Sequence, residues 1–345
     1  MKSLLTKLLA VGALAGAAAS AHASDYKVLS HYKIGGDNSR YDYISIDAAT
    51  RRAYVAHEKK FEVINADTGE KLGEIGPVTK AHGVALVPDT GHGFASSGID
   101  DTIIMFDLKT LEQLKRFKST GSNPDSIMYD PDTKRDYAAN HGDTGDVTVI
   151  DPATGDIVAT VKLDAKTLEG ICFDGRGHAF VNDEEKSSVH VFDTHTLKKM
   201  ATWPMTGGEG GTGIACDPES HRIFSSCANF KMIVLDSDSG KVVAAVATGE
   251  DPDGLTFDAK TKRIFTSNFD GTMTIIQQDS PDKYTVLQNV ATGLGYKTIG
   301  LDAKNGHVMT CGAKLGPKPA RVKGGPAPKA PIIPGTFEVL VIGEK

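Results

Sequence analysis

A short strand-like segment recurs along this chain at intervals of about forty residues. It first occurs as YISID at 43–47 and returns as GVALV (83–87), SIMYD (126–130), GICFD (170–174), GIACD (213–217), GLTFD (254–258) and TIGLD (298–302). Successive copies are 40, 43, 44, 43, 41 and 44 residues apart. In the complete units each copy is followed by three further short segments of strand character, separated by polar turns. Seven such units predict an all-β fold, a seven-bladed β-propeller with four-stranded blades.

The last unit is incomplete, and the beginning of the chain supplies what it lacks. After 298–302 the sequence offers HVMTC (307–311) and FEVLVI (337–342) and then ends without a fourth strand. The segment YKVLSHYKIGG (26–36) resembles fourth strands such as KVVAAVATG (241–249). We therefore expect the N-terminal strand to complete the last blade, because ring closure removes exposed strand edges.

Residues 316–335, GPKPARVKGGPAPKAPIIPG, interrupt this last blade. They lie between its second and third strands, where other blades have only a few residues. Proline-rich segments are extended and semi-rigid. The segment is therefore expected to act as a lid over the channel, as an arm that docks a partner, or as a disordered insertion.

The first 23 residues have the features of a secretory signal peptide. Lys2 and Lys7 precede a short apolar run, and Ala21-His22-Ala23 forms a small-residue cleavage site. No later segment is long and apolar enough to span a membrane. We expect a periplasmic protein in which residues 24–345 form a single propeller domain, acting as a monomer.

Charge and cysteine content exclude several classes of protein. Loss of Lys2 and Lys7 changes the formal net charge from −6 to −8, which argues against nucleic acid as a partner despite the basic residues of 316–335. The four cysteines, Cys172, Cys216, Cys227 and Cys311, have no C-x-x-C spacing. Since all four lie in apolar strand patterns, we expect buried thiols.

The second and third strands carry a recognisable motif. The tetrads YVAH (54–57), YAAN (137–140), FVND (180–183) and FTSN (265–268) are degenerate forms of Y-V-T-N, and VTVIDPATGDIVATV (147–161) matches the rest of that repeat. The chain thus resembles the YVTN-repeat or YncE-like β-propellers of bacterial envelopes. The resemblance implies the propeller fold over the whole mature chain and specifies no activity.

Repeat symmetry places one residue of each blade at the same end of the central channel. These strand-start residues, each directly before a first strand, are Asp42, His82, Asp125, Glu169, Thr212, Asp253 and Lys297. An outer circle on the same face is expected from the ends of the second strands: His57, Asn140, His141, Asp183 and Asn268. Tyr41 and Tyr296 adjoin the circle as stacking surfaces. Apart from Thr212, these residues are the predicted ligand-binding set.

Such a mouth suits a cation. Carboxylates and imidazoles bind divalent metal ions, for which His82, Asp125 and Glu169 are the candidate ligands. We favour a non-catalytic binding or scaffold protein that holds a small ligand, a metal ion or an envelope protein partner there. The alternative is a metal-dependent hydrolase or lyase, similar to lactonase-like or streptogramin-lyase-like propellers, with His82 and Glu169 in acid–base roles. A third reading is purely structural, with polar strand ends that hydrogen-bond neighbouring blades.

Overall fold

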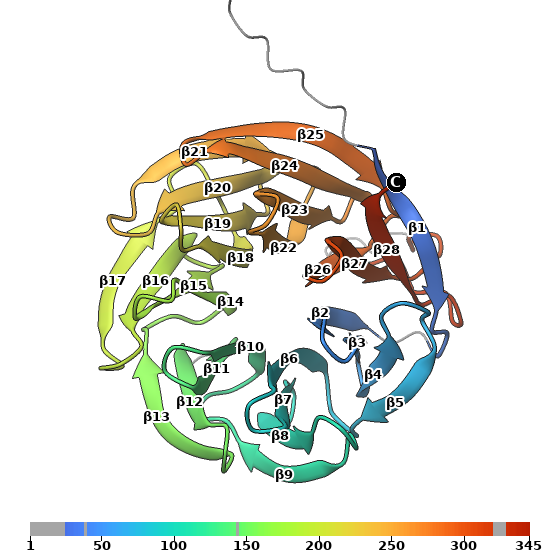
Figure 1. Ribbon diagram of the computed structural model, residues 1–345, viewed down its shortest axis with the longest axis horizontal. Helices are drawn as coiled ribbons and strands as arrows, with labels where there is room; N and C mark the ends of the chain where they lie inside the picture. Colours follow the sequence, from blue (N-terminus) through green and yellow to red (C-terminus); the bar gives the residue numbers. More distant parts are fainter. Residues whose placement is uncertain (1–24, 38–39, 143–144, 320–328) are drawn as a thin grey trace, which may run out of the picture.

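Seven antiparallel sheets of four strands are arranged in a ring around a central channel in the computed structural model (Figure 1). The structure describes residues 25–37, 40–142, 145–319 and 329–345. The predicted signal peptide and the centre of the proline-rich segment lie outside the described residues. The prediction of an all-β, seven-bladed propeller is confirmed.

Within each blade the strands follow the chain from the channel outwards, except in blade 7. The strands of blades 1 to 3 are β2 (Tyr41–Asp47), β3 (Arg52–His57), β4 (Lys60–Asn65) and β5 (Lys71–Ile75); β6 (Ala81–Val87), β7 (His92–Ser97), β8 (Thr102–Asp107) and β9 (Gln113–Lys118); and β10 (Pro124–Asp130), β11 (Arg135–Asn140), β12 (Asp146–Asp151) and β13 (Asp156–Lys162). Blades 4 and 5 comprise β14 (Leu168–Phe173), β15 (His178–Asp183), β16 (Ser188–Asp193) and β17 (Lys199–Pro204); and β18 (Gly211–Asp217), β19 (Arg222–Cys227), β20 (Lys231–Asp236) and β21 (Val242–Ala247). Blades 6 and 7 comprise β22 (Pro252–Asp258), β23 (Arg263–Asn268), β24 (Thr272–Ser280) and β25 (Lys283–Ala291); and β26 (Lys297–Asp302), β27 (His307–Gly312), β28 (Glu338–Glu344) and β1 (Tyr26–Lys33).

The N-terminal strand closes the ring, as the sequence predicted. β1 pairs antiparallel with β28, from Tyr26 opposite Glu344 to Lys33 opposite Glu338. Arg263 of blade 6 donates hydrogen bonds to the hydroxyl of Tyr26 (2.8 Å) and to Glu344 (2.6 Å). β1 is therefore held to β28 by backbone hydrogen bonds, and the closing blade is held to blade 6 by the side chain of Arg263.

The core consists of layers between adjacent blades, and the second strands supply its largest side chains. Their third residue is an aromatic in six blades and methionine in the seventh, and all are at most 1% exposed: Tyr54, Phe94, Tyr137, Phe180, Phe224, Phe265 and Met309. This position is the aromatic residue of the repeated tetrad. The tetrad is therefore a packing signature, because each ring fills the space between two blades.

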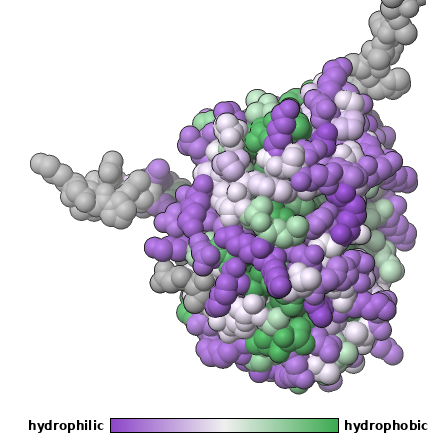
Figure 2. Space-filling model, turned by 90° about the vertical axis from the view of Figure 1, so that its left-hand side faces the viewer, coloured by the Kyte–Doolittle hydropathy of each residue, from purple (hydrophilic) through white to green (hydrophobic). Residues whose placement is uncertain are grey.

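The outer strands form a mixed rim. In Figure 2 the side of the molecule is mainly hydrophilic, with small apolar patches between polar side chains. Fourth strands alternate exposed and half-buried residues, and Met200 and Val158 are among the exposed apolar ones. No helix among the described residues is long and apolar enough to cross a membrane.

The described ends of the proline-rich segment lie against each other between β27 and β28. Gly316 N–H donates to the Pro331 carbonyl (2.7 Å) and Ile333 N–H donates to the Lys314 carbonyl (2.8 Å). Leu315 and Ile332 form a β-bridge. The insertion thus leaves and re-enters blade 7 through a paired neck.

Candidate functional site

A local irregularity of each first strand positions the strand-start residues. In six blades the register of the first strand against the second shifts across the strand-start residue, and in blade 7 it shifts directly after Lys297. Such bulges bend a strand and redirect a side chain. In addition, Lys80, Asn123 and Asp251, each two residues before a strand-start residue, have a positive φ. These features turn the strand-start residues toward the channel mouth.

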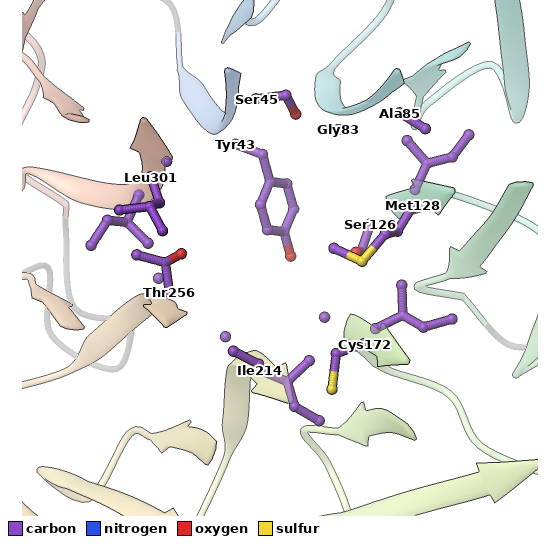
Figure 3. Close-up of a pocket in the computed structure, with 18 of the residues that line it drawn as sticks. Tyr43, Ser45, Gly83, Ala85, Ser126, Met128, Cys172, Ile214, Thr256 and Leu301 are labelled. Carbon is purple, nitrogen blue, oxygen red and sulfur yellow. The ribbon is translucent and has the colours of Figure 1, made fainter. Parts of the chain in front are cut away.

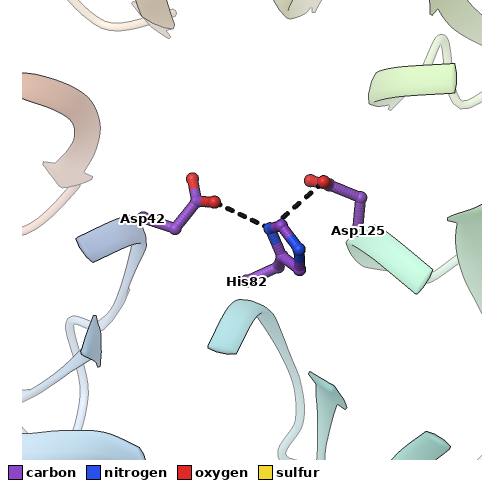
Figure 4. Close-up of side chains that lie close together, drawn as sticks. All are labelled: Asp42, His82 and Asp125. Carbon is purple, nitrogen blue, oxygen red and sulfur yellow. Dashed lines mark hydrogen bonds and ion pairs between the residues drawn. The ribbon is translucent and has the colours of Figure 1, made fainter. Parts of the chain in front are cut away.

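His82 lies between two carboxylates from the neighbouring blades (Figure 4). Its Nδ1 is 2.7 Å from Asp42 Oδ2 and 3.1 Å from Asp125 Oδ2. His82 and Asp125 are buried, and the Asp42 side chain is 20% exposed. Burial disfavours the imidazolium, but the charge of Asp125 and the hydrogen bond to Asp42 outweigh it and raise the pKa of His82 to about 9.

A second group of the same kind shares Asp125. His141 follows β11, and its Nδ1 is 2.9 Å from Oε1 of Glu169. Asp125, His141 and Glu169 each offer a donor atom within 4.8 Å of the others, as do Asp42, His82 and Asp125. Burial and the nearby charge of Asp125 raise the pKa of Glu169 to about 8. Two histidines and three carboxylates therefore converge on one side of the mouth.

The remaining strand-start residues balance this charge. Lys297 Nζ is 3.5 Å from Asp253 Oδ2, and the negative charges of Asp253 and Asp42 hold the pKa of Lys297 above its usual value. Thr212 instead hydrogen-bonds the Pro252 carbonyl (3.0 Å) of the next blade. Asp42, His82, Asp125, Glu169, Asp253 and Lys297 thus form one electrostatic ring, as their symmetry predicted.

Most of the predicted outer circle is turned inward. Asn140 hydrogen-bonds Asp146 and Thr148, Asn268 bonds Thr272 and Thr274, and Asp183 accepts from His190 at 3.0 Å. All three are fully buried and stabilise their own second-to-third-strand hairpins. His57 is also buried, with its ring 4.3 Å from that of Phe337. Among these positions, His141 is the one that joins the mouth cluster.

Tyr41 and Tyr296 are not exposed stacking surfaces, which corrects the expectation from their sequence positions. Tyr41 is 7% exposed, stacks on Phe337 and donates to the Gly295 carbonyl at 2.6 Å. Tyr296 is 5% exposed, and its hydroxyl donates to Glu338 at 2.5 Å. Both side chains pack in the core because the bulged strand ends turn them away from the channel.

The cysteine expectation was correct for two residues and wrong for two. Cys227 and Cys311 are buried free thiols. Cys172 and Cys216 form a disulfide between β14 and β18, the inner strands of blades 4 and 5. The two cysteines occupy nearly equivalent positions of consecutive blades, so propeller symmetry brings them together across 44 residues of chain.

Tyr43 is a channel residue that sequence reasoning missed. Its side chain projects into the centre of the channel in Figure 3, toward Ser126 and Cys172. The residues at the same position in the other blades are small: Gly83, Ser126, Gly170, Gly213, Gly254 and Thr298. In the aligned repeats, Tyr43 is the single large side chain at a position that is otherwise glycine, serine or threonine, and this exception could have identified it from the sequence.

Comparison with known proteins supports the fold and nothing more specific. No protein-family model matches the sequence, and a search of curated proteins gives no match. Among solved structures, a chain of Kuenenia stuttgartiensis hydrazine synthase is similar, with a TM-score of 0.70 and 16% identity. The similarity covers 82% of this chain and 94% of that chain. At this identity it indicates a shared β-propeller fold alone.

Proposed function

We propose that this protein is an exported binding propeller that holds a divalent transition-metal ion at its channel mouth. The ion is bound by Asp42, His82 and Asp125. The observation that carries the proposal is the convergence of their three donor atoms within 4.8 Å, each from a different blade of a rigid ring. Donors fixed on neighbouring strands need little rearrangement to bind an ion.

The donor set favours one class of metal. One imidazole nitrogen with two carboxylate oxygens suits Zn²⁺ or Mn²⁺, whereas Ca²⁺ prefers a larger set of oxygen ligands. In the metal-free state a proton on His82 links the two carboxylates. A metal ion replaces that proton and offsets the same negative charges, so binding is an exchange of one cation for another.

His141 and Glu169 extend the cluster on the far side of Asp125. Because Asp125 belongs to both groups, its carboxylate is the donor whose loss damages the site most. Asp253 is engaged by Lys297, which keeps that carboxylate paired and outside the metal set. The proposal therefore ranks Asp125 first, His82 and Asp42 next, and Asp253 last in importance for metal binding.

Export to the periplasm and membership of the YVTN-repeat or YncE-like propellers are parts of the same proposal. Residues 1–23 carry the signal-peptide pattern, and the repeated tetrad carries the family resemblance. The Cys172–Cys216 disulfide supports export, because disulfides persist in oxidising compartments.

Elemental analysis of protein purified without a histidine tag, followed by thermal melts with Zn²⁺, Mn²⁺ or Ca²⁺, tests the proposal. We expect Zn²⁺ or Mn²⁺ to raise the melting temperature and Ca²⁺ to have a smaller effect. Asp125→Asn should lose the shift, whereas Asp238→Asn, an equal change of charge on an exposed turn between β20 and β21, should keep it. Protein that is isolated without metal and gains no stability from any of the three ions would overturn the proposal.

A further inference from the structure

The channel beneath the mouth contains a cavity of small-molecule size. The inner strands of all seven blades enclose about 690 Å³, within the range of about 300 to 1,000 Å³ typical of ligand sites. Its lining is largely apolar and includes Ile44, Met128, Ile214, Leu255 and Leu301. The Met128 side chain is 40% exposed and lies across the open space from Leu301 in Figure 3. The channel therefore offers an apolar compartment directly below a ring of charged groups.

Tyr43 projects into this compartment although its position normally takes a small residue. A Cβ atom at Gly83 would lie 3.1 Å from the Asp125 carbonyl oxygen, and one at Gly213 would lie 2.5 Å from the Leu255 nitrogen. The neighbouring inner strand thus leaves no room for a side chain at Gly213 and little room for one at Gly83. Blade 1 instead directs a large aromatic side chain into the channel (Figure 3). Among the described residues the Tyr43 hydroxyl makes no hydrogen bond, so no hydrogen-bond partner in the protein accounts for its position.

The electrostatic setting of Tyr43 selects for a positively charged ligand. Tyr43 directly follows Asp42 in β2, so its side chain lies next to the strand-start residues of the mouth. The ring is therefore near the mouth carboxylates of Asp42 and Asp125, which lie on either side of His82. The face of a tyrosine ring attracts organic cations, and carboxylates accept charge-assisted hydrogen bonds from ammonium groups.

We infer that the channel binds a small organic ammonium ion with an apolar body. The ammonium group lies among the mouth carboxylates at Tyr43, and the apolar body extends into the channel past Met128 and Ile214. This site is a second function of the mouth and does not require a metal ion. Its test is run in the presence of a chelator, so that failure of the metal proposal and failure of this inference are separate results.

The test uses three probes that share a phenylalkyl body and differ in charge. Isothermal titration calorimetry of the mature protein, residues 24–345, is carried out with 4-phenylbutylamine, 4-phenylbutan-1-ol and 4-phenylbutyrate. We expect the amine to bind and the alcohol and the carboxylate to bind at least about tenfold more weakly, because only the ammonium pairs with the mouth carboxylates. Equal affinity for the three probes, preference for the carboxylate, or no binding of the amine at millimolar concentration would overturn the inference.

Substitution of Tyr43 tests its part in the site. Tyr43→Ser introduces the residue that blade 3 has at the same position, Ser126, so the propeller should fold and its thermal melt should remain cooperative. Affinity for the amine should fall about tenfold in this variant, while Tyr43→Phe, which keeps the ring face, should stay within about threefold of the unsubstituted protein. Unchanged amine binding in Tyr43→Ser, or an equal loss in both variants, would show that the tyrosine ring is not the binding surface.

Discussion

Asp136 places a carboxyl group among apolar side chains at the interface between blades 2 and 3. It is the second residue of β11, where the other blades have Ala53, Gly93, Ala179, Ile223, Ile264 and Val308. The side chain is fully buried, and neither of its oxygens has a hydrogen-bond partner. Burial alone raises its pKa from 3.8 to about 8. The carboxyl group is therefore protonated in the folded protein at neutral pH.

This pKa sets a pH dependence of stability. Because the folded pKa lies above the unfolded value, the folded state keeps a proton that the unfolded chain releases between pH 3.8 and about 8. Stability falls as the pH rises through this window. At about 1.4 kcal/mol per pH unit, the loss between about pH 5 and about pH 8 is roughly 4 kcal/mol, or about 6 °C in melting temperature for a chain of this length.

Asp136→Val removes the titration and matches the valine that blade 7 has at the equivalent position, Val308. Urea and thermal melts at about pH 5 and about pH 8 should show a steep loss of stability for the unsubstituted protein and a much shallower one for Asp136→Val. The substitution should therefore be most stabilising at the higher pH. Asp136→Asn should also flatten the dependence but gain less stability, because its amide remains unpaired.

The exposed Asp238→Asn provides the control and should keep the unsubstituted slope. If Asp136→Val and the unsubstituted protein lose the same stability between the two pH values, the assignment of a buried, protonated Asp136 is refuted.

Three further predictions follow from the disulfide, the ring closure and the mouth. Replacing both Cys172 and Cys216 with serine should lower the free energy of unfolding by up to about 4 kcal/mol, which is the loop entropy for a separation of 44 residues. In thermal melts, reductant should destabilise the unsubstituted protein and leave the double variant unchanged. Deleting Tyr26–Lys33 should expose the edge of β28 and lower the melting temperature sharply, and an unchanged melt would contradict closure by β1. Zn²⁺ binding should release protons and strengthen from about pH 6 to about pH 8, because the pKa of His82 is raised to about 9. Calorimetry in buffers of different ionisation enthalpy measures the number of protons released. Binding that weakens as the pH rises would argue against His82 as a ligand.

The blade count and the closing strand were predictable from the sequence because both depend on the backbone repeat. An aromatic or methionine residue in every second strand fills a gap between blades, so the spacing of these residues reports the fold. Symmetry also placed Asp42, His82, Asp125 and Glu169 at one mouth, since equivalent strand positions occupy equivalent places in a ring.

Side-chain directions were less predictable, because they depend on local bulges. Tyr41 directly precedes Asp42, yet it packs on Phe337 while Asp42 approaches His82. Asn140 and Asn268 end second strands but bond within their own hairpins. Tyr43 was visible in the sequence only as an exception to a column of small residues. The repeat therefore determines which strand ends meet, and the bulges determine which side chains face the channel.

The central claim is that Asp42, His82 and Asp125 bind a divalent metal ion, and its most direct test is calorimetric titration of the metal-free protein with Zn²⁺. The account predicts saturable binding that weakens at least about tenfold in Asp125→Asn and in His82→Ala, each with an unchanged circular dichroism spectrum. Asp238→Asn should bind as the unsubstituted protein does. Absence of saturable binding, or equal affinity in the unsubstituted protein and in Asp125→Asn, would contradict the account.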